Sequence, residues 1–74
     1  METVFISSNY ITLGQLMKFV NIISNGSEAK IAVMELKISI NGALENRRGR
    51  KIYPGDIVKI EKNTYLVQLK NEIN

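Results

Sequence analysis

Four cationic side chains lie within five residues of this sequence, on either side of a single glycine: Arg47, Arg48, Arg50 and Lys51. Like charges at this density repel one another and are costly to bury, so we expect the stretch to be an exposed loop. Three of the four are arginines, whose planar guanidinium groups can bind a phosphate through two parallel hydrogen bonds. This stretch, Asn46–Lys51, is called the basic loop, and it favours binding of a polyanion, although most charged runs are only solvated.

Tyrosine rings are the second type of side chain with a clear binding chemistry. Aromatic rings stack on unpaired bases in proteins that bind single-stranded nucleic acid. Tyr53 follows the basic loop directly, so base stacking and ordinary packing both remain open for it. Tyr65 lies in a run of apolar and β-branched residues, where we expect it to pack within a strand.

Residues suited to catalysis or metal binding are sparse. The chain has neither His nor Cys, which removes the commonest general base, the thiol nucleophile and two principal zinc ligands. Its seven carboxylates lack the spacing of a catalytic dyad or a metal site. Asp56, after Pro54-Gly55, is expected to accept hydrogen bonds from its own turn. We therefore expect no enzyme activity, no cofactor and no metal site.

Length and composition limit the chain to one small domain. With 74 residues and 45% hydrophobic residues, it can form a single modest core. The net charge is +3, and residues 47–51 alone carry four positive charges, so the remainder is slightly acidic. The chain has no cysteine, no signal-peptide pattern and no apolar run near the roughly 20 residues of a membrane span. These features predict a cytoplasmic protein with no membrane partner.

Local signals predict one strand and two short helices in the first half of the chain. Thr3–Ser7 has the composition of a short edge strand. Thr12 and Gln15 have the spacing of a capping box, which predicts a helix that ends near Ser24–Gly26. Ser27 is the predicted N-cap of a second helix. The buried face of that helix is predicted to contain Ala29, Ala32, Val33 and Leu36.

The pattern of the second half predicts strands joined by tight turns. Ile38 and Ile40 alternate with polar residues and should face the core. Asn41-Gly42 predicts a type I′ hairpin turn, because both residues accept a positive φ, and Pro54-Gly55 fits a type II turn. Two further strands, at residues 57–61 and 64–69, are predicted to be joined at Lys62-Asn63.

These elements together predict an α+β fold, in which a two-helix hairpin packs on a small antiparallel β-sheet. Residues 1–74 are expected to form a single domain with its core at about 11–69. Residues 71–74 are expected to be a frayed tail.

The order of these elements, and several short motifs, resemble the ribosomal-protein-S-four-type RNA-binding domain, also called the αL motif. Ala29, the stretch Ile38–Gly42 and the stretch Gly55–Ile60 match the general pattern of that family. Three stretches are similar to its small stand-alone bacterial branch, the YaaA type: Ile11–Gln15, Asn25–Lys30 and Asn46–Lys51. The likeness covers nearly the whole chain, from about Ile11 to Ile60.

The resemblance implies non-catalytic binding of structured RNA, of the ribosomal or transfer RNA type, and possible association with the ribosome. The RNA-binding residues that it implies are Ser27, Lys30, Arg47, Arg48, Arg50 and Lys51. Backbone N–H groups at the start of the second helix are a further expected phosphate site. The chain departs from the family at Gly26, where many members have an arginine, and at Leu36, where a glycine usually ends the second helix.

A different function remains open on the sequence alone. The chain is equally consistent in charge with a protein-interaction module whose basic loop contacts an acidic surface on a protein partner. A nuclease or nucleotide-modifying enzyme is a third alternative.

Overall fold

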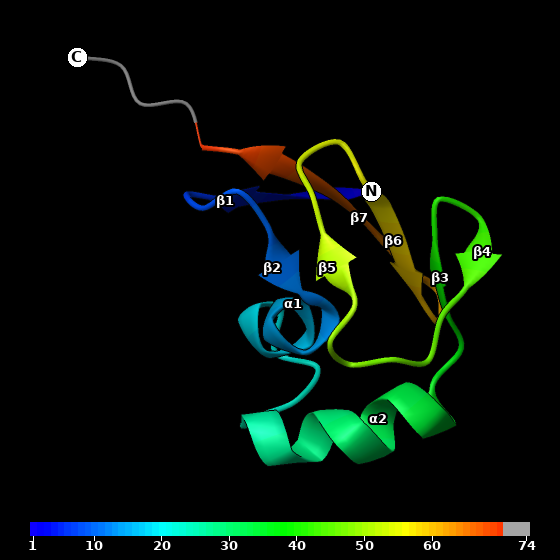
Figure 1. Ribbon diagram of the computed structural model, residues 1–74. Helices are drawn as coiled ribbons and strands as arrows, with labels where there is room; N and C mark the ends of the chain where they lie inside the picture. Colours follow the sequence, from blue (N-terminus) through cyan, green and yellow to red (C-terminus); the bar gives the residue numbers. More distant parts are fainter. Residues whose placement is uncertain (71–74) are drawn as a thin grey trace.

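A five-stranded sheet, a two-stranded ribbon and two short helices make up the computed structural model, which describes residues 1–70 (Figure 1). The sheet has the strand order β1 (Glu2–Ile6), β7 (Asn63–Leu69), β6 (Ile57–Ile60), β3 (Ile38–Ile40), β4 (Ala43–Leu44). The ribbon pairs β2 (Ile11–Thr12) with β5 (Lys51–Ile52). The helices are α1 (Leu13–Phe19) and α2 (Ala29–Glu35), the latter preceded by a 3-10 turn, η1 (Gly26–Glu28). The expected tail at 71–74 lies outside the described residues.

The α+β class is confirmed, but the sheet is mixed and not purely antiparallel. Strand β1 lies at the sheet edge, as predicted, and pairs in parallel with β7, from Glu2 opposite Tyr65 to Ile6 opposite Leu69. Parallel neighbours need a long crossover, and here the whole chain between β1 and β7 provides it. The alternation of buried and exposed residues in a strand is the same for either direction of pairing, so the sequence pattern does not encode it.

The first helix begins as predicted and ends earlier than predicted. The capping box is present: Gln15 N donates to Thr12 Oγ1 at 3.1 Å, and Thr12 N donates to Gln15 Oε1 at 2.8 Å. Helix α1 stops at Phe19, and Asn21 adopts the left-handed conformation with φ of 64°. Asparagine tolerates this conformation, so the chain turns before the predicted end at Ser24–Gly26.

We expect Thr12→Ala to lower the free energy of unfolding by about 1 kcal/mol, because the N–H of Gln15 loses its acceptor. Urea unfolding monitored by circular dichroism measures the change. Thr12→Ser is the matched control, since it keeps the hydroxyl oxygen and should retain most of the stability. Equal losses in the two variants would assign the role of Thr12 to its methyl group and not to the cap.

The start of the second helix differs from the prediction, because Asn25 and not Ser27 caps the 3-10 turn η1 that leads into α2, and Glu28, at the N-cap position of α2, makes no side-chain cap. Asn25 Oδ1 accepts a hydrogen bond from Ser27 N at 3.1 Å, and Glu28 completes a capping box with the backbone of Asn25. Asparagine followed three residues later by glutamate is itself a capping signal. The two helices are in contact as expected, and Figure 1 shows α1 nearly end-on while α2 lies across the view, so their axes cross.

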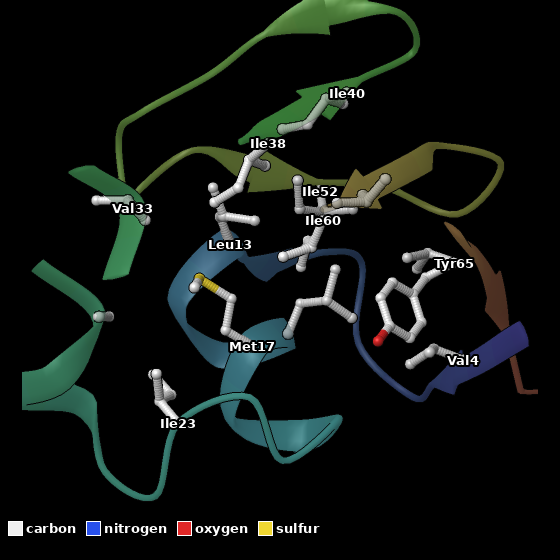
Figure 2. Packing of buried hydrophobic residues seen from close by; sticks show 14 of the residues in the cluster. Val4, Leu13, Met17, Ile23, Val33, Ile38, Ile40, Ile52, Ile60 and Tyr65 are labelled. Atoms are coloured by element: carbon white, nitrogen blue, oxygen red, sulfur yellow. The ribbon is translucent and has the colours of Figure 1, made fainter. Parts of the chain in front are cut away.

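The core forms where the helices cover the sheet (Figure 2). Ile38 and Ile40 are each 2% exposed and join Leu16 in one buried cluster, with Val20 packed against it, which confirms the predicted strand register. The buried cluster also includes Val4, so the core begins before the expected start at residue 11. Tyr65 is buried, as predicted.

Tight turns fix the ends of the central strands. Asn41 and Gly42 have φ of 52° and 87°, which confirms the type I′ turn. The predicted turn at Lys62-Asn63 is wrong by one residue. Asn63 already pairs with Ile60, and the turn is occupied by Glu61, which has φ of 55°. A backbone conformation with positive φ is rare for glutamate, so a turn at this residue could not be predicted from its type.

Pro54-Gly55 forms the predicted turn between β5 and β6. Gly55 has φ of 97°, and Asp56 N donates to Tyr53 O at 3.0 Å across the turn. Asp56 Oδ2 in return accepts from Tyr53 N at 2.8 Å, which confirms the structural role expected for this carboxylate. Its second oxygen accepts from Asn41 Nδ2 at 3.0 Å and ties this turn to the hairpin turn.

Candidate nucleic-acid interface

The backbone of the basic loop is held by the start of helix α1. Leu13 N donates to Arg50 O at 2.8 Å, and Gly14 N donates to Arg48 O at 2.9 Å. The first N–H groups of a helix have no partner within the helix, so the loop carbonyls satisfy them. The loop is exposed, as predicted, and its path is nevertheless fixed at two points by the helix.

Gly14 allows the basic loop and the two helices to approach one another closely. A Cβ atom at this position would lie 3.2 Å from the Cβ of Ala29 and 3.5 Å from Arg48 O. An open hollow of about 240 Å³ lies at this junction, and its lining includes Lys18, Gly26 and Arg48. The tertiary structure therefore brings the basic loop beside the 3-10 turn η1 and adds Lys18, which is not among the RNA-binding residues implied by the resemblance.

Glu45, directly before the basic loop, anchors two of its arginines. Only 6% of its side chain is exposed, and its oxygens accept from Arg47 Nε at 2.8 Å and Arg50 Nη1 at 2.9 Å. The backbone N–H of Arg47 also donates to it, at 3.0 Å. The hydrogen bond from the Arg47 side chain is the largest cause that holds the pKa of Glu45 at about 2, and Arg50 adds to it while burial opposes it. The same pairing raises the pKa of Arg47.

The four cations of the basic loop therefore fall into two pairs. Arg47 and Arg50 are ion-paired with Glu45, whereas Arg48 and Lys51 make no salt bridge within residues 1–70. Arg48 lines the hollow beside α1, and Lys51 lies over the ring of Tyr10, with its Nζ 4.8 Å from the ring centre. In the sequence the four cations are equivalent, so the two pairs cannot be distinguished from it.

Several backbone donors around the start of the second helix are already used. Ser27 N and Ser27 Oγ both donate to Asn25 Oδ1, and Glu28 N donates to Asn25 O at 3.2 Å. The Glu28 carboxylate accepts from Ser24 N and Asn25 N, and the hydrogen bond from Ser24 N is the largest cause that lowers its pKa. This arrangement argues against the expected phosphate site at these backbone groups, because oxygens of Asn25 and Glu28 already accept from them.

The side chains of Ser27 and Lys30 are exposed, as their predicted role requires. The Ser27 hydroxyl donates its proton to Asn25, so only its oxygen lone pairs remain for a ligand. Lys30 lies on α2 and makes no salt bridge within the described part of the chain. Of these two residues, Lys30 is therefore the one whose charge is available to a phosphate.

Residues 1–70 contain neither a membrane-spanning helix nor a cluster of metal ligands. The helices in this part of the chain are too short and too polar to cross a membrane. Within the same residues no three Asp or Glu side chains gather as a metal site would require.

Comparison with known proteins places these residues within one recognisable unit. The model of a family described as the S4 domain matches residues 4–68, which span both helices, the five strands β2 to β6 and parts of β1 and β7. The chain is also similar to a protein of Bacillus subtilis (strain 168) named "Probable ribosome maturation protein RlbA". The two are 45% identical over 56 residues, which cover 76% of this chain and 79% of the relative.

Proposed function

Because this chain belongs to the S4 domain family, we propose that it binds structured RNA and catalyses no reaction, with Arg48 and Lys51 as its principal phosphate contacts. The observation that carries the proposal is that Arg48 and Lys51 make no salt bridge within residues 1–70 and lie in a loop whose backbone is fixed by α1. The name of the Bacillus relative supports ribosomal RNA, free or within a ribosomal particle, as the RNA class.

Phosphate neutralisation at these positions has a direct physical basis. Arg48 and Lys18 line the same hollow, so two cations from different elements can approach neighbouring phosphates. Arg47 and Arg50 have their guanidinium groups oriented by Glu45, and the exposed side of Arg47 adds a weaker contact. Lys30 extends the positive surface along α2. Double-stranded RNA is recognised mostly through its shape, sugars and phosphates, so we expect little base specificity from these contacts.

Salt titration tests this proposal through two double variants of equal charge. Each phosphate contact contributes a slope of about −0.7 to −0.9 to the dependence of log affinity on log salt. Arg48→Gln with Lys51→Gln should therefore make the slope shallower by about 1.4 to 1.8. Arg47→Gln with Arg50→Gln is the matched control, and it should change the slope by less than about one, because Glu45 competes for those guanidinium groups. A melting curve on each variant verifies folding.

Equal changes of slope in the two double variants would contradict the assignment of Arg48 and Lys51 as the principal contacts. Competition between RNA and DNA hairpins of the same length tests the ligand class, and RNA should compete better because of its 2′-hydroxyl groups and A-form shape. Absence of RNA binding, together with capture of an acidic protein through the same cations, would replace the proposal by the protein-interaction alternative.

A further inference from the structure

The ribbon formed by β2 and β5 has one apolar face and one face with aromatic and cationic side chains. Ile11 pairs with Ile52 and Thr12 with Lys51, so the same register places Tyr10 opposite Tyr53 one step further along. Side chains alternate between the two faces of a strand. Since Ile52 is fully buried in the core, Lys51 and Tyr53 must point away from it.

On that outer face three side chains gather. The rings of Tyr10 and Tyr53 have their centres 5.6 Å apart with 49° between their planes. Lys51 Nζ lies 4.8 Å from the centre of the Tyr10 ring. As whole residues, Tyr10 and Tyr53 remain 39% and 48% exposed, in contrast to Tyr65, which is 4% exposed in the core. We call Tyr10, Tyr53 and Lys51 the aromatic platform.

We propose that the aromatic platform binds one unpaired base of the RNA, so that the preferred ligand is a helix interrupted by a bulged nucleotide. This inference rests on the proposed function. A base can stack on one ring and contact the edge of the other, since the rings are tilted. Lys51 then neutralises the phosphate of the same nucleotide, and Arg48, in the middle of the loop, binds the paired backbone. Stacking depends on the ring face, so any of the four bases satisfies it.

The test compares two RNA hairpins that differ by a single bulged adenosine in the stem. Base stacking on a protein ring typically changes affinity by about 5-fold to 100-fold. The wild-type protein should therefore bind the bulged hairpin about tenfold more tightly than the fully paired one. Tyr53→Leu and Tyr10→Leu should each remove most of that preference and leave affinity for the paired hairpin within about twofold, because the phosphate contacts are intact.

Tyr53→Phe is the first control and should keep the preference, since stacking needs the ring and not the hydroxyl. Tyr65→Phe is the second, because that ring lies in the core. The inference is overturned if the wild-type protein binds both hairpins equally, or if folded Tyr53→Leu and Tyr10→Leu variants both keep the preference. In both of these outcomes the protein still binds the two hairpins, so the proposed function is retained. Failure of the wild-type protein to bind either hairpin would overturn the proposed function as well.

Discussion

Ile40→Asp is expected to abolish cooperative unfolding. Ile40 lies in β3, belongs to the buried cluster and is 2% exposed, and the core within residues 1–70 holds no buried polar or charged side chain (Figure 2). An unpaired carboxylate in this position costs several kcal/mol, against a total stability of about 5 to 10 kcal/mol for a domain of this size. Thermal and urea unfolding monitored by circular dichroism should show a gradual loss of signal without a transition.

The matched control for this substitution is Ile31→Asp. Ile31 lies on α2 and is 62% exposed, so the same change of side chain leaves the carboxylate in water. We expect Ile31→Asp to keep a cooperative transition, with stability within about 1 kcal/mol of the wild-type value. A cooperative transition in Ile40→Asp would mean that the strand faces the core with its other set of side chains, which a shift of one residue produces.

Glu45→Gln is expected to lower the free energy of unfolding at neutral pH by about 2 kcal/mol, because charge-assisted hydrogen bonds from Arg47 and Arg50 are weakened. The pKa of Glu45 is about 2 in the folded protein and 4.5 ordinarily, so its stabilising effect is complete above about pH 4.5 and disappears as the pH falls toward 2. Between pH 2 and pH 7 the free energy of unfolding should therefore change less with pH in the variant than in the wild-type protein. Unfolding curves recorded across this range measure the difference.

Part of the acid sensitivity should survive in Glu45→Gln, because the pKa of Glu28 is also lowered by the hydrogen bonds from Ser24 and Asn25. Glu35→Gln serves as the control, since it removes an exposed carboxylate that makes no salt bridge within residues 1–70. It should match the wild-type protein at neutral pH. Parallel pH curves for Glu45→Gln and the wild-type protein would contradict the role of Glu45 as the anchor of the basic loop.

Features that depend on a few neighbouring residues were predictable from the sequence. The capping box at Thr12, the turn at Asn41-Gly42 and the turn at Pro54-Gly55 all close through hydrogen bonds or dihedral angles within about four residues. The alternation of Ile38 and Ile40 fixed which side of β3 is buried, because the period of a strand determines its faces. The exposure of the basic loop followed from charge repulsion alone. The binding of RNA by these residues remains a prediction.

The tertiary structure decided how those local pieces meet. Helix α1 has its first N–H groups satisfied by carbonyls more than 30 positions away in the sequence, and Gly14 makes room for that contact. The parallel pairing of β1 with β7 and the meeting of Tyr10 with Tyr53 also join distant segments. Four cations that are equivalent in the sequence became one pair held by Glu45 and one pair that makes no salt bridge within residues 1–70. Contacts of this kind depend on how the core packs as a whole, so no local pattern of residues specifies them.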